Sequence, residues 1–185
     1  MKPGAGSRPL GKPVRPSAVF LVGFMGAGKT SVGRKLSARL GWTFEDLDER
    51  IQNREGRPIG EIFRDSGEAE FRRAEHEALR ELLNEGGTAP RVVALGGGAF
   101  AQSRNAALLE EYGALVIFLD GQADELFRRC EAENSERPMR QDTKQFHELY
   151  QQRRPFYLKA TRRVDTTGKD LDTITAEVAC SLGLQ

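Results

Sequence analysis

Residues 23–30 read Gly-Phe-Met-Gly-Ala-Gly-Lys-Thr, which matches the pattern G-x-x-x-x-G-K-[ST]. An apolar run rich in strand formers, residues 17–22, lies directly before them, and an amphipathic stretch, residues 30–40, follows. A buried strand, a glycine-rich turn and a helix in this order bring the N–H groups of the loop and the helix N-terminus onto one anion. The pattern therefore indicates a nucleoside triphosphate as ligand.

Each residue type in this loop has a defined task. Glycines allow positive φ and let the backbone approach a phosphate closely. We expect Lys29 to lie against the β- and γ-phosphates and the Thr30 hydroxyl to be a ligand of Mg²⁺. These two residues thus serve the phosphoryl donor.

Two carboxylates follow the second strand-like run in the sequence Phe-Glu-Asp-Leu-Asp, residues 44–48. Ligands of open α/β sheets bind at the carboxyl ends of strands. If the backbone stays extended, Asp46 and Asp48 lie on one side of it. One could then hold Mg²⁺ through water while the other accepts a proton from an attacking hydroxyl. The alternative is that both only cap the helix that follows.

Further candidates lie at the end of the third strand-like run and on three arginines. Residues 96–98 are three consecutive glycines, whose exposed backbone N–H groups can bind hydroxyl or carboxylate oxygens. Arg72, Arg137 and Arg153 each offer a planar fork that binds a carboxylate in two places. The pattern alone does not separate the roles of the three arginines.

Strand-like and helix-like segments alternate along the chain. The strand-like runs are residues 17–22, 42–45, 91–95, 114–119 and 163–165. The clearest predicted helix spans residues 68–85, with a capping box at Asp65 and Glu68 and a stop at Gly86-Gly87. This alternation predicts a single α/β domain with a parallel sheet that carries helices on both faces.

Composition limits the class of protein. The chain has 185 residues, 38% of them hydrophobic and 30% charged, and no apolar run reaches the length of a bilayer helix. The first residues lack the apolar core of a secretory signal, so we expect a cytoplasmic location. The spacing of Cys130 and Cys180 supports neither a disulfide framework nor a zinc cluster.

Residues 1–16 hold basic residues and no acidic ones, together with several prolines and glycines, and we expect a disordered basic tail. Without the tail, no net basic excess is left to hold a nucleic-acid backbone. Residues 128–154 carry many charges of both signs. They form either a mobile flap over the active site or a solvated connection.

Six motifs in this order resemble shikimate kinase: Gly-Phe-Met-Gly-Ala-Gly-Lys-Thr, Phe-Glu-Asp-Leu-Asp, Glu-Phe-Arg-Arg-Ala-Glu, Leu-Gly-Gly-Gly-Ala, Arg-Pro-Met and Arg-Arg-Pro-Phe-Tyr. The resemblance covers about residues 17–183. It implies a five-stranded parallel sheet of the nucleoside monophosphate kinase-like P-loop type, flanked by helices on both faces, with a flexible lid at about residues 128–142. It also implies transfer of the γ-phosphoryl group of ATP to the 3-hydroxyl of shikimate, in aromatic amino-acid (chorismate) biosynthesis.

The resemblance implies roles for individual residues. Nucleotide contacts are implied for Gly26, Ala27, Gly28, Lys29, Thr30, Ser31, Arg137 and either Arg129 or Arg128, with Arg129 ranked first. Mg²⁺ binding is implied for Thr30 and Asp46. Acceptor contacts are implied for Asp48, Phe63, Phe71, Arg72, Gly96, Gly97, Gly98 and Arg153. Direct participation in catalysis is implied for Lys29, Asp48 and Arg137.

The sequence departs from the family's usual pattern in three places, one of which is a shifted spacing between Arg137 and the adenine-side arginine, Arg129 or Arg128. The lid reads Arg137-Pro138-Met139-Arg140 where two leucines usually follow the proline, and residues 164–171 lack the usual proline after Asp-Thr. The nearest alternative is a related small-molecule kinase such as a gluconate kinase, and a second is a non-catalytic nucleotide-binding descendant. The expected partners are the small molecules ATP and shikimate, with no nucleic acid, no membrane and a monomeric state.

Overall fold

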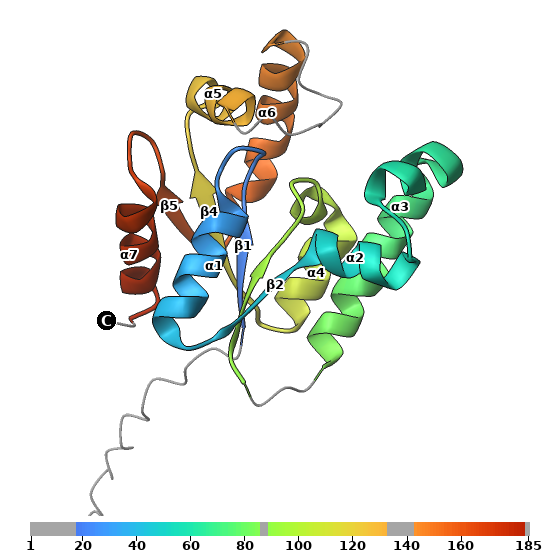
Figure 1. Ribbon diagram of the computed structural model, residues 1–185, viewed down its shortest axis with the longest axis horizontal. Helices are drawn as coiled ribbons and strands as arrows, with labels where there is room; N and C mark the ends of the chain where they lie inside the picture. Colours follow the sequence, from blue (N-terminus) through green and yellow to red (C-terminus); the bar gives the residue numbers. More distant parts are fainter. Residues whose placement is uncertain (1–17, 86–88, 133–142, 184–185) are drawn as a thin grey trace, which may run out of the picture.

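The computed structural model describes residues 18–85, 89–132 and 143–183. Its strands form one parallel sheet in the order β2-β3-β1-β4-β5 (Figure 1). The strands are β1 (Ala18–Val22), β2 (Thr43–Asp46), β3 (Arg91–Ala94), β4 (Leu115–Asp120) and β5 (Arg162–Asp165). Each overlaps one of the five predicted runs, so the predicted parallel sheet is confirmed. The predicted tail, most of the predicted lid and Arg137 lie outside the described residues.

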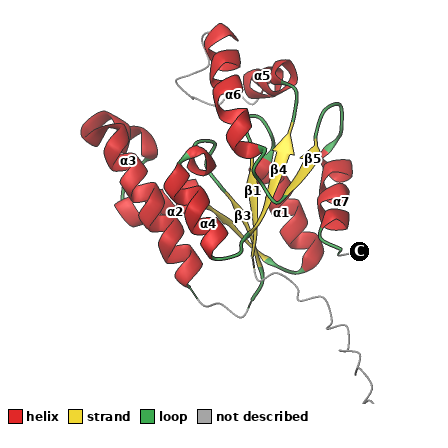
Figure 2. Cartoon of the chain, turned by 180° about the vertical axis from the view of Figure 1, so that it is seen from behind, coloured by secondary structure: helices red, strands yellow, loops and turns green. Residues whose placement is uncertain are grey.

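Helices cover both faces of the sheet. They are α1 (Lys29–Leu40), α2 (Leu47–Glu55), α3 (Ile59–Asn84), α4 (Ser103–Glu111), α5 (Ala123–Ala132), α6 (Thr143–Tyr157) and α7 (Leu171–Ser181), with a short 3₁₀ turn η1 (Ala99–Ala101). Helices α1 and α7 lie side by side on one face, and α4 covers the opposite face (Figures 1 and 2). Within the described residues, no helix combines the length and apolarity that spanning a membrane requires.

The central strands are buried on both faces. In β1, Val19 through Val22 are at most 1% exposed, and Ile117 and Leu119 of β4 are fully buried. Strands of a parallel sheet read as continuous apolar runs for this reason, because the helices exclude water from both faces. The sequence signal for these two strands is strong because no polar alternation interrupts it.

The strand order determines where the polar loops meet. Strand β3 pairs with β2 on one side and with β1 on the other, all in parallel. The carboxyl ends of the three strands therefore lie at the same edge of the sheet. The glycine-rich loop after β1, the acidic end of β2 and the glycine turn after β3 are brought together there, although up to 75 residues separate them in the sequence.

Helix α3 differs from its prediction. It begins at Ile59 and is interrupted at Gly67, whose φ of 79° and ψ of 175° are not helical. The predicted start at residue 68 marks only the second half, and Asp65 lies inside the first half, where its carboxylate accepts a hydrogen bond from Arg64 Nε at 3.0 Å. The capping-box assignment is therefore wrong as a description of where α3 begins.

The break in α3 gives a prediction with a matched control. Gly67→Ala should lower the free energy of unfolding by about 1–3 kcal/mol, because a residue with a Cβ is strained at this φ and ψ. Gly60→Ala in the same helix should raise it by up to about 1 kcal/mol, because Ala favours a helix. Neither new Cβ meets another atom within 4 Å.

Denaturant unfolding of both variants measures the two free energies. Equal effects of the two substitutions would contradict the observed break at Gly67.

Candidate active site

The loop after β1 is shaped by two glycines at its tight turns. Gly26 and Gly28 both have a φ of 78°, a conformation that L-residues avoid. A Cβ on Gly26 would also press on the Leu126 carbonyl oxygen and lie 2.9 Å from Cys130 Sγ, both on α5. Gly28 is the N-cap of α1, so the loop leads directly into the helix N-terminus. This geometry is the one that the predicted anion site requires.

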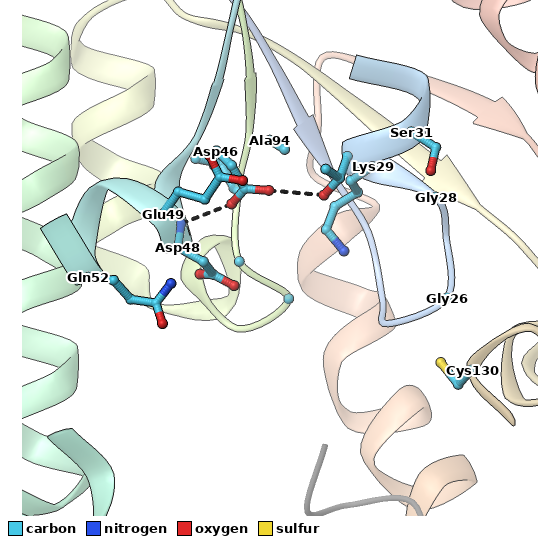
Figure 3. Close-up of a pocket in the computed structure, with 14 residues that line it drawn as sticks. Gly26, Gly28, Lys29, Ser31, Asp46, Asp48, Glu49, Gln52, Ala94 and Cys130 are labelled. Atoms are coloured by element: carbon cyan, nitrogen blue, oxygen red, sulfur yellow. Dashed lines mark hydrogen bonds between the residues drawn. The ribbon is translucent and has the colours of Figure 1, made fainter. Parts of the chain in front are cut away.

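Lys29 is folded back over the loop. Its ammonium donates to the carbonyl oxygens of Gly23 at 2.9 Å and Phe24 at 3.0 Å. The side chain points into a cavity of about 210 Å³ beside the loop (Figure 3). A cation held at this point faces any phosphate that enters the cavity.

Asp46 caps the helix that follows it, as one of the two alternatives from the sequence holds, and it also contacts Thr30. Its Oδ1 accepts a hydrogen bond from the Asp48 backbone N–H at 3.0 Å, which caps α2, and its Oδ2 accepts one from Thr30 Oγ1 at 2.9 Å. The backbone does not stay extended, because α2 begins at Leu47. Asp48 is therefore in the first turn of α2, and both carboxylates still face the cavity (Figure 3).

The cavity is lined by residues from several elements: Gly26, Gly28, Lys29, Thr30, Ser31, Asp46, Asp48, Glu49, Gln52, Ala94, Leu95, Gly96, Gly97 and Cys130. The sequence did not single out Glu49, Gln52 or Cys130. The first two lie on α2 within four residues of Asp48, so helical spacing offered a signal for them. Cys130 comes from α5, and no local pattern indicated it.

The three consecutive glycines after β3 each lie against a different side chain. A Cβ on Gly96 would be 2.5 Å from Asp48 Oδ1, and one on Gly98 would be 2.8 Å from an Arg72 guanidinium nitrogen. A Cβ on Gly97 would be 3.8 Å from an Arg153 guanidinium nitrogen. The turn therefore gathers a carboxylate from α2 and two guanidinium groups from α3 and α6 at one point beside the cavity.

Arg72 is held by acidic residues of its own helix. Its guanidinium donates to Glu75 Oε2 at 3.0 Å and to Glu68 Oε1 at 3.2 Å, and the Glu75 side chain is 1% exposed. Burial is the largest cause that raises the pKa of Glu75, and the nearby Asp48 raises it further, whereas Arg72 opposes the shift. Glu75 is a site residue that the sequence analysis missed, because its burial depends on tertiary packing.

Two phenylalanines lie together beside Arg72. The rings of Phe63 and Phe71 are 4.5 Å apart between centroids, and the Arg72 guanidinium lies 5.1 Å from the centre of the Phe71 ring. Phe71 is buried, whereas 38% of Phe63 is exposed. The pair forms an apolar wall beside the charged groups.

Comparison with known proteins identifies the family. A family model described as shikimate kinase matches residues 25–182. The chain belongs to the shikimate kinase family. It is 37% identical over 160 residues to the shikimate kinase of Persephonella marina, covering 86% of this chain and 95% of the relative. It is 42% identical over 164 residues to that of Geobacter sulfurreducens, covering 87% and 88%.

A solved structure shows the same fold. The shikimate kinase of Acinetobacter baumannii, in complex with shikimate, superposes with a TM-score of 0.81 at 31% identity, covering 92% of this chain and 94% of that chain. The predicted nucleoside monophosphate kinase-like P-loop fold is therefore confirmed. The resemblance to shikimate kinase that rests on the six sequence motifs is confirmed as well.

The structure distinguishes Arg129 from Arg128, the two arginines predicted to lie beside adenine. Arg129 pairs with Glu125 and donates to the Thr166 carbonyl oxygen at 3.0 Å. Arg128 donates instead to the Asp124 carbonyl oxygen of its own helix at 3.4 Å. Arg129 is thus the one that contacts the loop after β5, and adenine stacking by it stays a prediction.

Helix α6, which carries Arg153, is tied to the sheet by Asp120. This carboxylate is 5% exposed and accepts a hydrogen bond from Arg154 Nη2 at 2.7 Å, and it pairs with Arg163 of β5 at 2.8 Å. Tyr150 of α6 also donates to the Gly121 carbonyl oxygen at 2.9 Å. These contacts hold α6 against the sheet.

Because Glu75 is buried, we expect the free energy of unfolding to depend on pH. The pKa of Glu75 is raised above its ordinary value of 4.5 in the folded state, so the ionised carboxylate disfavours folding. The contribution of protonated Glu75 to the free energy of unfolding is complete below pH 4.5 and is lost as the pH rises through the folded-state pKa. Glu75→Gln removes this dependence. The unfolding free energy of the variant relative to the native chain should therefore increase as the pH rises from 4 to 7.

Denaturant unfolding at several pH values tests this slope. A constant difference between the two proteins would mean that Glu75 is not desolvated in the folded state.

Proposed function

We propose that this chain transfers the γ-phosphoryl group of ATP to the 3-hydroxyl of shikimate, giving shikimate 3-phosphate. One observation carries the proposal: the turn at residues 96–98 gathers Asp48, Arg72 and Arg153 beside the cavity of the glycine-rich loop. Such a cluster suits an acceptor with both a carboxylate and a hydroxyl. The shikimate complex of the Acinetobacter baumannii relative supports this choice of acceptor.

On the donor side, the loop N–H groups and the α1 N-terminus bind the phosphates. Lys29 would exchange the carbonyl oxygens of Gly23 and Phe24 for oxygens of the β- and γ-phosphates. Phosphoryl transfer needs positioning and charge neutralisation more than covalent chemistry, and these groups provide both. Gly26, Ala27, Gly28 and Ser31 form the rest of this phosphate contact.

The residues beside the loop fit a magnesium ion. A hydroxyl from Thr30 and a carboxylate from Asp46 lie together, and oxygen donors of this kind are the ligands Mg²⁺ prefers. Thr30 would bind the ion directly and Asp46 through water. When bound, the ion neutralises charge on the transferring phosphoryl group.

On the acceptor side, we assign the residues by charge. Arg72 and Arg153 would hold the shikimate carboxylate, because two guanidinium forks match its oxygens. Asp48 would orient the 3-hydroxyl and accept its proton. Gly96, Gly97 and Gly98 would offer backbone N–H groups to ring substituents, and Phe63 with Phe71 would pack against the ring.

The principal alternative acceptor is gluconate. Gluconate also carries a carboxylate and hydroxyl groups, but it has no ring to pack against the aromatic wall of Phe63 and Phe71. A non-catalytic role is disfavoured because Lys29 and Asp48 are both present at the cavity. The expected cytoplasmic location and monomeric state stay predictions.

ADP release by the purified chain tests the proposed function. With ATP and Mg²⁺, shikimate should accelerate release, whereas gluconate at the same concentration should not. Lys29→Met should abolish the acceleration, because the variant lacks the cation at the phosphates. Equal release with and without shikimate would reject the acceptor assignment and leave the nucleotide site standing.

Two neighbouring arginines provide a matched test of the carboxylate site. Arg153→Ala should raise the KM for shikimate on the order of 100-fold, the scale of a lost charged hydrogen-bonded pair, and leave the KM for ATP within about twofold. Arg154→Ala should instead lower the free energy of unfolding by about 1–3 kcal/mol, because it loosens the tie to Asp120.

Steady-state kinetics with each substrate varied in turn, together with denaturant unfolding, separates these outcomes. An effect of Arg153→Ala confined to ATP would show that this arginine serves the donor.

A further inference from the structure

Tyr157 lies one helical turn after Arg153 on α6. Residues four apart lie on the same face of a helix, and here both approach the glycine turn. The Tyr157 hydroxyl donates to the Gly97 carbonyl oxygen, and the Arg153 guanidinium is within 3.8 Å of the Cβ position of Gly97. The two side chains thus contact the same residue from one helix face.

The Tyr157 ring itself is locked in the core. The residue is 1% exposed, and its ring packs against Phe118 of β4 with a centroid distance of 5.3 Å. Burial raises the pKa of Tyr157 to about 12, and the positive charge of Arg153 opposes this shift. The phenol therefore stays protonated near neutral pH, so its hydroxyl can donate to the Gly97 carbonyl oxygen.

The hydrogen bond to the Gly97 carbonyl oxygen orients the whole peptide group between Gly97 and Gly98. No cis peptide bond occurs among the described residues, and in a trans peptide the C=O and N–H groups point in opposite directions. A hydroxyl that holds the Gly97 carbonyl therefore also sets the direction of the Gly98 N–H. Glycine has no side chain to restrict this peptide plane, so an external contact has to orient it.

We propose that Tyr157 is a positioning residue for the acceptor carboxylate: its hydroxyl orients the peptide between Gly97 and Gly98 and fixes the guanidinium of Arg153. The proposal rests on the proposed function, since it deepens the role assigned to the residues 96–98 and to Arg153. Tyr157 does not touch the substrate in this scheme. It acts through two groups that do.

Tyr150 offers an internal control on the same helix. Its hydroxyl also donates to a glycine carbonyl oxygen, that of Gly121 at 2.9 Å, but at the end of β4 rather than at the acceptor turn. Arg154 keeps α6 tied to Asp120 when this hydroxyl is removed. Phenylalanine at either position retains the ring and deletes one hydroxyl: Tyr157→Phe loses the hydrogen bond to Gly97, and Tyr150→Phe loses those to Gly121 and, at 3.4 Å, to Asp120.

The experiment compares Tyr157→Phe with Tyr150→Phe by steady-state kinetics, once the native chain has shown shikimate-dependent ADP release. Tyr157→Phe should raise the KM for shikimate about tenfold and leave the KM for ATP within about twofold, the scale of one lost hydrogen bond. Tyr150→Phe should leave both values within about twofold. An unchanged KM for shikimate in Tyr157→Phe, or an equal rise in both variants, would overturn the proposal.

Discrimination between shikimate and its methyl ester gives a readout that a purely structural role would not move. The ester removes the acceptor's negative charge, so the ratio of kcat/KM for acid over ester measures the carboxylate site directly. Tyr157→Phe should reduce this ratio about tenfold, and Tyr150→Phe should preserve it. The same ratio in both variants would mean that Tyr157 supports only the fold.

Fluorine NMR of the native sequence tests the proposal without relying on Tyr157→Phe being folded. The chain has three tyrosines, so 3-fluorotyrosine gives three signals, which Tyr112→Phe and Tyr150→Phe assign by elimination. Shikimate should shift the Tyr157 signal, and its methyl ester should shift it less. Movement of the Tyr150 signal alone would contradict the proposal. A native chain without shikimate-dependent ADP release would instead overturn the proposed function itself.

Discussion

The turn at residues 96–98 brings charged side chains close to its backbone, and the arrangement of the proposed acceptor site depends on this close approach. A carboxylate from α2 and two guanidinium groups from α3 and α6 approach its backbone so closely that a Cβ at Gly96 or Gly98 would collide with Asp48 or Arg72. None of these three glycines needs an unusual φ. The requirement at Gly96 and Gly98 is therefore close approach rather than backbone freedom, in contrast to Gly28 in the loop after β1, whose φ is positive and whose Cβ position is not crowded.

The charged groups around this turn are held before any substrate arrives. Arg72 lies against the buried Glu75, and α6 is tied to the sheet through the buried Asp120. Burying a carboxylate costs solvation free energy, which a close guanidinium partner offsets in part. Such pairs hold side chains in one geometry, and catalysis by positioning requires this.

Local patterns predicted the parts of the molecule that depend on local physics. The strands β1 and β4 are continuous apolar runs, and the glycine-rich loop has a fixed spacing, so both were readable from the sequence. The start of α3 was missed because the break at Gly67 resembles a helix boundary. The roles of Glu75 and Tyr157 could not be read, because each depends on which distant residues surround the side chain. The side chains of neighbouring arginines such as Arg128 and Arg129 point in different directions, and the spacing of residues in the sequence does not show which direction each one takes.

The hydrogen bonds of Lys29 to Gly23 and Phe24 have a consequence for the selectivity of the loop. A cation without partners would bind any small anion, whereas this one already has two carbonyl oxygens in place. An incoming anion must replace both, so a single weak contact gains little free energy. A polyphosphate that also reaches the loop N–H groups and the helix N-terminus makes several contacts at once and can offset the exchange. The hydrogen bonds that the loop makes to itself thus favour anions that reach several of its groups at once.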